Sequence, residues 1–284
     1  MSPSTPPTMP TGTAAPSPSG PTGPTGDDAP HIRPWIVEAL GLRALHTSHD
    51  AVQSVMRLDA PDALALAYTR TMMGVLLCVP QPRRIAMVGL GGGTLVKFCH
   101  RHLAPAMLSV AEINPHVLAL RETFHVPPDD ARLQVDLADA TAWVRTLPED
   151  TDVLLVDGFD PEGLPPALGA QAFFDDAAAA LADGGVLAMN LPLDEPTLPQ
   201  VMDRLARAFG HACAEDGGLL WVDGVDESNR IAFAWRGRAF NRHAPGRLRL
   251  PDSLPLDEAQ ALCDDLRPML AAWRRLRSGG RPAA

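Results

Sequence analysis

Short apolar segments alternate with helical segments from residue 85 to residue 209, and this alternation limits the folds that the chain can adopt. The apolar segments predict strands at residues 85–88, 108–113, 132–135, 153–156 and 186–190. Helices are predicted over residues 94–102, 115–124, 138–147, 170–182 and 196–209. Because parallel strands need a crossover connection, which is usually a helix, this order predicts a parallel sheet with helices on both faces.

The pattern changes near the end of this region. Two further apolar segments, residues 219–222 and 231–235, are separated by a turn-like connection with the sequence Val-Asp-Glu-Ser-Asn. Such a short connection is typical of an antiparallel hairpin. The chain is therefore predicted to form an α/β fold with a seven-stranded, methyltransferase-like (Rossmann-type) sheet, which is mostly parallel and ends in an antiparallel C-terminal hairpin.

Composition divides the chain into four parts. Residues 1–30 hold nine of the 29 prolines, and with few apolar side chains this Pro/Gly/Ser/Thr-rich segment is predicted to be a disordered tail. Residues 31–83 are predicted to form a small N-terminal lobe with a helix over residues 62–78, and residues 84–236 the α/β domain. Residues 237–284 are predicted to be an extension with one helix, over residues 257–277, that packs on the body.

Charge and cysteine content narrow the functional classes. The formal net charge is −10, from 24 basic and 34 acidic residues, which disfavours a nucleic-acid partner and favours small cationic ligands. The four cysteines form no Cys-x-x-Cys pair, as expected in a reducing, cytoplasmic location. Neither a signal peptide nor a membrane span is predicted. His100 and His102 would point in different directions on a helix, so no metal site is predicted.

The strongest local motif is the glycine-rich connection between the first predicted strand and its helix. Gly89, Gly91, Gly92 and Gly93 precede Thr94, so the spacing differs from the usual dinucleotide fingerprint. Glycines allow positive φ and let a ligand approach the main chain. The motif predicts either a nucleotide-binding loop or a tight structural turn.

Two acidic positions favour the nucleotide interpretation. Glu112 ends the second strand, where a carboxylate can accept hydrogen bonds from both hydroxyls of a ribose. Asp139 and Ala140 follow the third strand, where an acid can accept a hydrogen bond from the amine of adenine. The alternatives are an ordinary surface glutamate at position 112 and a helix N-cap at Asp139. In this order, the loop and the two acids predict a ligand that contains adenosine.

Asp157 and Asp160 follow the fourth strand, in the sequence Asp-Gly-Phe-Asp-Pro. Two carboxylates in the cleft of an α/β sheet repel each other unless a cation lies between them. A turn in which one aspartate caps the next helix would explain only one of them. A cationic amine substrate would explain both.

These motifs together resemble the polyamine aminopropyltransferases, in particular spermidine synthase-like bacterial proteins. The similarity covers about residues 45–235. It includes the glycine loop and the sequences Glu112-Ile-Asn-Pro, Asp139-Ala140, Asp157-x-x-Asp160-Pro and Leu181-x-x-Gly-Gly-Val-Leu. Upstream, Gln53 and Tyr68 are similar to the family's nucleoside-contacting glutamine and active-site tyrosine.

The resemblance implies transfer of an aminopropyl group from decarboxylated S-adenosylmethionine to a small amine such as putrescine. It implies that Glu112 holds the ribose, Asp139 the adenine, and that the loop from Gly89 to Gly93 passes beneath the donor's aliphatic arm. Asp157, helped by Tyr68, would accept the proton of the attacking amine, and Asp160 would hold that amine. The co-substrate would be the only cofactor, without metal or prosthetic group, and the resemblance also implies a homodimer.

Two other interpretations stay open. Family synthases usually carry an aspartate inside the glycine loop, and this loop has none. An S-adenosylmethionine-dependent methyltransferase would use the same fold with ordinary S-adenosylmethionine. A paralogue that binds a nucleoside without turnover would also tolerate the loss of the acid.

Overall fold

A computed structural model describes residues 31–48, 52–160, 162–210, 217–224, 228–237 and 250–277. The chain divides into two units after Pro30, and all described residues belong to the second unit. The predicted tail, Cys213 and residues 238–249 of the predicted extension lie outside the described residues. Within the described ranges, no helix combines the length and the apolar character that crossing a membrane requires.

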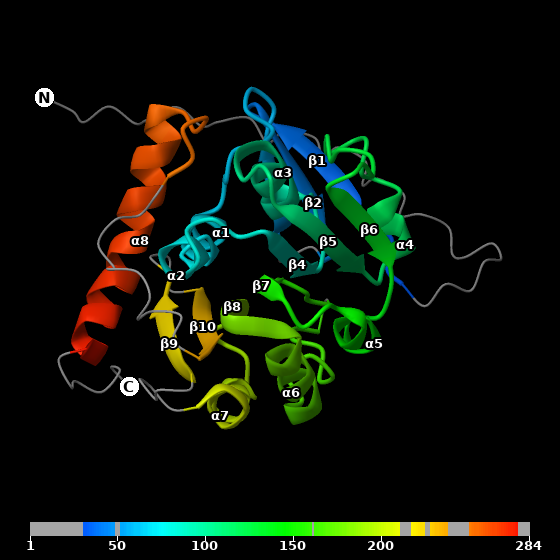
Figure 1. The fold of residues 1–284 in the computed structure, drawn as a ribbon. Helices are drawn as coiled ribbons and strands as arrows, with labels where there is room; N and C mark the ends of the chain where they lie inside the picture. Colours follow the sequence, from blue (N-terminus) through cyan, green and yellow to red (C-terminus); the bar gives the residue numbers. More distant parts are fainter. Residues whose placement is uncertain are drawn as a thin grey trace, which may run out of the picture. The chain divides into compact units, whose positions relative to one another are not determined.

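The central sheet has seven strands in the order β6-β5-β4-β7-β8-β10-β9 (Figure 1). The strands are β4 (Arg84–Val88), β5 (Met107–Glu112), β6 (Leu133–Leu137), β7 (Thr151–Val156), β8 (Leu181–Pro192), β9 (Gly217–Asp223) and β10 (Asn229–Arg236). From β6 to β8 neighbouring strands pair in parallel, whereas β10 pairs antiparallel with both β8 and β9. The predicted sheet and its C-terminal hairpin are confirmed.

Alternate residues of the central strands enter two separate cores. On β4, Ile85 and Met87 belong to the core that includes α3, whereas Ala86 and Val88 belong to the core that includes α6 and α7. This follows from the two-residue period of a strand. The helices of the α/β region are α3 (Thr94–His102), α4 (Pro115–Leu118), α5 (Ala140–Trp143) with the 3-10 turn η1 (Val144–Thr146), α6 (Gln171–Ala180) and α7 (Leu198–Phe209).

Three predicted helices are wrong in extent. The helix predicted over residues 115–124 ends at Leu118, after which backbone bonds to the third preceding residue replace helical ones, as from Leu120 N–H to the Val117 carbonyl. The helix predicted over residues 138–147 tightens into η1. The helix predicted over residues 62–78 is two helices, α1 (Ala67–Met72) and α2 (Val75–Cys78).

Gly74, between α1 and α2, lies in a closely packed place. Gly74 lies so close to α8 and β10 that a Cβ atom there would overlap the Met269 sulfur and touch the ring of Phe233. Helix α8 (Leu256–Arg277) matches the predicted C-terminal helix and packs against α1 and β9 (Figure 1). An ion pair of 2.5 Å between Arg70 Nε and Asp265 Oδ2 joins α1 to α8.

The predicted N-terminal lobe is a three-stranded antiparallel sheet of β1 (Trp35–Ala39), β2 (Leu42–His46) and β3 (Val52–Arg57). It meets the α/β region where β3 reaches α3. There the buried Ser54 places its Oγ 3.3 Å from Thr94 Oγ1, at the first residue of α3. The lobe therefore lies directly against the end of the glycine loop.

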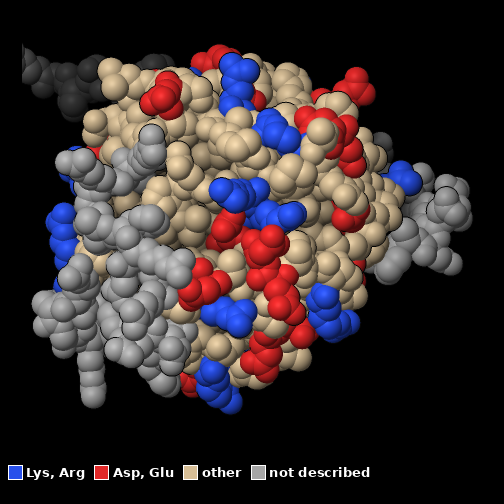
Figure 2. All heavy atoms as spheres, in the orientation of Figure 1, with Lys and Arg blue, Asp and Glu red and all other residues tan. Residues whose placement is uncertain are grey.

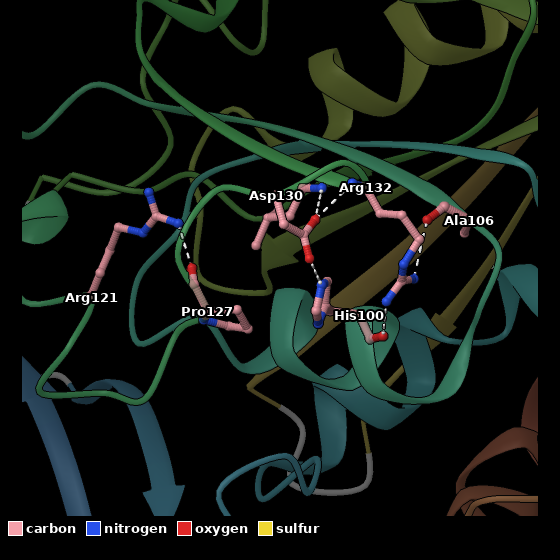
Figure 3. Close-up of polar contacts among 7 residues, drawn as sticks. His100, Ala106, Arg121, Pro127, Asp130 and Arg132 are labelled. Carbon is pink, nitrogen blue, oxygen red and sulfur yellow. Dashed lines mark hydrogen bonds and ion pairs between the residues drawn. The ribbon is translucent and has the colours of Figure 1, made fainter.

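A polar cluster joins α3 to the segment before β6 (Figure 3). Asp130 accepts hydrogen bonds from the backbone N–H groups of Arg132 and Leu133, and its Oδ2 lies 2.9 Å from His100 Nε2. These bonds lower the pKa of Asp130 to about 2, with the Arg132 N–H as the largest cause. His102 instead bonds Ser253 Oγ at 2.8 Å, so the two histidines have different partners.

On the face shown in Figure 2, acidic side chains gather in a band with basic ones among them.

Gly89, just after β4, lies close to the backbone of Asp157, just after β7. Its φ is +88°, and a Cβ atom there would overlap the backbone carbonyl of Asp157. Gly91 also has positive φ, +51°, but a Cβ atom there would lie 3.7 Å from Ser54 Cβ, an ordinary contact.

We therefore expect Gly89→Ala and Gly91→Ala to differ. Gly91→Ala should lower the free energy of unfolding by about 1–2 kcal/mol, which is the cost of a left-handed alanine. Gly89→Ala should cost a further ~1–3 kcal/mol, because the backbone of β7 must also move. Urea unfolding of both variants measures the difference, and equal losses would contradict the close approach at Gly89.

Lys97, the only lysine of the chain, is 1% exposed on α3 and donates to the Phe124 carbonyl at 2.8 Å. Burial lowers its pKa from 10.5 to about 8, partly opposed by the charge of Asp62. Between these two values the unfolded chain binds more protons than the folded chain, so stability gains with rising pH.

We expect the unfolding free energy of the wild type, minus that of Lys97→Met, to increase by ~2 kcal/mol from pH 7 to pH 9.5. Taking the difference removes the contributions of other titrating groups. A difference that stays flat, or falls, over this range would show that the ammonium is not held in a desolvated site.

Candidate active site

The carboxyl ends of four neighbouring strands bring the principal polar residues to one edge of the sheet. Strands β5, β4, β7 and β8 are adjacent and parallel. The first three end at or just before Glu112, Gly89 and Asp157, and Asn190 lies two residues before the end of β8. In open α/β sheets, this edge is where ligands bind. Residues predicted from three separate motifs are thus neighbours in the fold.

Glu112 is hydrogen-bonded to the backbone of the glycine loop. The residue is 7% exposed, and its two carboxylate oxygens accept backbone hydrogen bonds, Oε2 from Leu90 N–H and Oε1 from Asn114 N–H, both at 2.8 Å. An ionised carboxylate offers about four acceptor positions. The remaining two can accept hydrogen bonds from a diol, as the predicted ribose contact requires.

The glycine loop is enclosed by side chains from other segments. Ser54 of β3 lies against Gly91 and Gly92, while Phe124 lies against Gly92 and Val126 against Gly93. Gly93, with φ of +67°, is the N-cap position of α3. The loop is therefore closely packed at Gly92 and Gly93, and less closely at Gly91.

Asp157 is held by two neutral donors. Tyr68 Oη donates to its Oδ2 at 3.1 Å, and Asn190 Nδ2 donates to its Oδ1 at 2.9 Å. Burial raises the pKa of Asp157 above the ordinary carboxyl value, and the bonds from Asn190 and Tyr68 only partly oppose this. Burial, together with the charge of Asp157, raises the pKa of Tyr68 well above its usual value. Tyr68 therefore stays protonated and acts as a donor.

Asn190 is a site residue that the sequence-based interpretation did not include. It is 3% exposed, two residues before the end of β8, and its Oδ1 accepts a 2.7 Å hydrogen bond from Asn229 Nδ2 of β10. The available signal was a lone amide closing the apolar run of residues 186–189. Its meaning depends on the pairing of β8 with β10, which the run itself does not reveal.

Asp139 and Asp160 both organise their own local turns. Asp139 is exposed and caps α5, which begins at Ala140, by accepting from Thr141 N–H at 2.7 Å. Bonds from the side chain and backbone of Thr141 lower its pKa. Asp160 Oδ1 accepts from Glu162 N–H at 3.0 Å, and its backbone bonds that of Gly163 in both directions. The N-cap alternative for Asp139 thus describes its hydrogen bonds, and the ligand roles of both residues stay predictions.

The contacts between β3 and the loop are made by Ser54, the neighbour of Gln53. Successive strand residues point to opposite faces, so Gln53 is directed away from the side on which Ser54 meets the loop. Gln53 is half-buried. Its predicted nucleoside contact stays a prediction.

Comparison with known proteins is consistent with this arrangement. A family model described as "Spermine/spermidine synthase domain" matches residues 65–212. A "Polyamine aminopropyltransferase" of Neisseria meningitidis serogroup A is 35% identical over 203 residues, which are 71% of this chain and 75% of the relative.

Solved structures share the fold. A probable spermidine synthase from Corynebacterium glutamicum has a TM-score of 0.63 at 16% identity and covers 88% of this chain and 92% of its own. Human Methyltransferase-like protein 13, in complex with SAH, has a TM-score of 0.57 at 24% identity, with 72% and 93% covered. At these identities the structures show the fold alone. The sequence matches go further, and this chain belongs to the spermine/spermidine synthase family, which is a family of transferases.

Proposed function

We propose that this protein transfers an aminopropyl group from decarboxylated S-adenosylmethionine to a small amine such as putrescine. The observation that carries the proposal is the environment of Asp157, a half-buried carboxylate with raised pKa at the ligand-binding edge of the sheet, beside the glycine loop. An acceptor of this kind suits the proton of an amine that becomes a nucleophile. Family membership supports the same reaction.

The proposed reaction is a single displacement. The amine nitrogen attacks the methylene carbon beside the sulfonium, the C–N bond forms, and the C–S bond breaks to leave a neutral thioether. Asp157 accepts the proton that the amine must lose. The hydrogen bond from Tyr68 to Oδ2 keeps that carboxylate oriented. The sulfonium is already an activated leaving group, so the step needs no metal.

The donor would occupy the α/β domain predicted over residues 84–236. Glu112 would accept both ribose hydroxyls with the acceptor positions that Leu90 and Asn114 leave available. Asp139 and Ala140, at the start of α5, would contact the adenine, and Gln53 the nucleoside from the N-terminal lobe. Asp160 would hold the amine substrate in the connection after β7.

A methyltransferase reaction is the second candidate, and one feature favours it. The loop reads Gly91-Gly92-Gly93, without an acid to bind the free amine of a decarboxylated donor. Calorimetric titration with decarboxylated and with ordinary S-adenosylmethionine, followed by product analysis, separates the candidates. A thioadenosine product supports aminopropyl transfer, a homocysteine nucleoside indicates methyl transfer, and binding without any product indicates a non-catalytic paralogue.

The two aspartates should respond differently to substitution. Asp157→Asn should lower kcat by ~10²–10⁴-fold, the usual effect of losing a positioned base, while donor binding persists. Asp160→Asn should mainly raise KM for the amine. In the pH dependence of the wild-type kcat, the midpoint of the acid limb should lie above the ordinary carboxyl pKa, since Asp157 accepts a proton only when it is ionised. Full activity of Asp157→Asn with an amine that the wild type uses would contradict this role.

Glu112→Gln tests the donor site. The substitution replaces one acceptor oxygen by an NH2 group, so one backbone donor and part of the ribose contact are lost. Donor binding should weaken by ~1.5–3 kcal/mol, typical of hydrogen bonds to a charged group. Glu122→Gln, at an exposed position after α4, is the matched control and should bind like the wild type. Unchanged affinity of Glu112→Gln in calorimetry would show that the ribose lies elsewhere.

A further inference from the structure

A chain of three hydrogen bonds runs from the hairpin of β9 and β10 to Asp157. Ser228 Oγ donates to Asn229 Oδ1 at 2.6 Å, Asn229 Nδ2 donates to Asn190 Oδ1 at 2.7 Å, and Asn190 Nδ2 donates to Asp157 Oδ1 at 2.9 Å. Asn190 is buried at 3% exposure. Its amide thus contacts Asp157 at one end and Asn229 at the other.

The direction of this chain depends on the charge of Asp157. An ionised carboxylate only accepts hydrogen bonds, so it requires the NH2 group of Asn190. The oxygen of Asn190 then requires the NH2 group of Asn229, and the oxygen of Asn229 requires the hydroxyl of Ser228. A protonated Asp157 could donate instead and reverse every bond, because the hydroxyl of Ser228 can also accept. The observed direction is the one that stabilises the carboxylate.

Backbone hydrogen bonds hold this chain of side-chain hydrogen bonds in place. Asn229 lies opposite Pro192 in the antiparallel register of β10 and β8. The Ser228 carbonyl accepts from Leu193 N–H at 2.9 Å, and the Asn229 carbonyl accepts from Gly224 N–H at 2.7 Å. The amide of Asn229 is therefore fixed relative to Asn190, and rotation of the side-chain amides is the main freedom left.

The groups that face Asp157 are few. From α1, the titratable group is Tyr68, which donates to Oδ2. From β8, the neutral amide of Asn190 donates to Oδ1, and β4 contributes backbone at Val88 and Gly89. Among the described residues, the pKa of Asp157 is changed by burial and by these two side-chain donors alone. If the amide of Asn190 turned its oxygen toward Asp157, the change in the pKa of Asp157 should therefore be measurable.

We propose that Asn229 and Asn190 are positioning residues, which orient the amide of Asn190 so that Asp157 is held as the ionised proton acceptor. The importance of this amide orientation for catalysis rests on the proposed function. The orientation itself does not, because it concerns the resting protein. It can therefore be tested without any substrate.

The sole tyrosine provides the probe. Tyr68 donates to Asp157, so protein labelled with ¹³C at tyrosine Cζ should give one resonance whose shift follows the ionisation of Asp157. Asn229→Asp places an acceptor where a donor stood, draws the NH2 group of Asn190 away from Asp157 and turns its oxygen toward it. The titration midpoint should rise by about 1–2 pH units, as expected for the loss of one hydrogen bond to a charged group.

A double-mutant cycle separates orientation from charge, since the new aspartate is itself negative. In an Asn190→Ala background, Asn229→Asp should raise the midpoint by much less, because only the charge of the new aspartate remains. The same rise in both backgrounds would overturn the proposal, and so would an unchanged midpoint in Asn229→Asp alone. Asp157→Asn, which should abolish the titration, confirms the assignment of the signal.

The neutral variant Asn229→Ala decides the question if Asn229→Asp does not fold. It removes the donor to Asn190 and should raise the midpoint in the same direction by a smaller amount, whereas no change would overturn the proposal. Turnover assays are run separately on the same variants. A protein with the expected midpoints but no aminopropyl transfer would refute the proposed function and leave this inference standing.

Discussion

The contact between the backbones of β4 and β7 at Gly89 is the constraint on which the site depends. Asp157 N–H donates to the Val88 carbonyl, and Gly89 N–H donates to the Ala111 carbonyl, so three strand ends are joined at one point. A side chain at Gly89 would push them apart. Since Leu90 follows directly, its N–H reaches Glu112, and the same geometry determines where both the loop and Asp157 lie.

The electrostatics of the site follow from this crowding. Asp157 is half-buried, so solvent stabilises its charge only in part, and the hydrogen bonds that stabilise it come from a phenol and an amide, both neutral. Neutral donors lower the cost of the charge without cancelling it. A positive ligand would be attracted to such a carboxylate, and an amine close to it could pass on its proton. An Arg or Lys in the place of Asn190 would lower the proton affinity that a general base needs.

The sequence predicts the strands and four of the helices well, and the extent of three other helices poorly, for physical reasons. Buried parallel strands are continuous apolar runs bounded by turn residues, so a local pattern identifies them. At Gly74, between α1 and α2, a side chain would overlap Met269, almost two hundred positions later, and no local pattern reports such a contact. Glu112 and Asp157 could be identified because each ends a strand. The bond between Asn190 and Asn229 depends on the register of the C-terminal hairpin, which its composition does not specify.

The space around the glycine loop bears on the absence of an acidic residue in it. Ser54, Phe124 and Val126 enclose Gly91, Gly92 and Gly93, and a Cβ atom at Gly92 would already meet Ser54 Oγ at 2.7 Å. An acidic side chain at Gly92 or Gly93 would need the N-terminal lobe or the segment after α4 to move away. Gly91 has space for a side chain, but its positive φ disfavours one. The closely packed surroundings of the loop are thus consistent with glycines at these positions. Under the proposed function, a charge that answers the amine of a decarboxylated donor would come from another segment around the sheet edge.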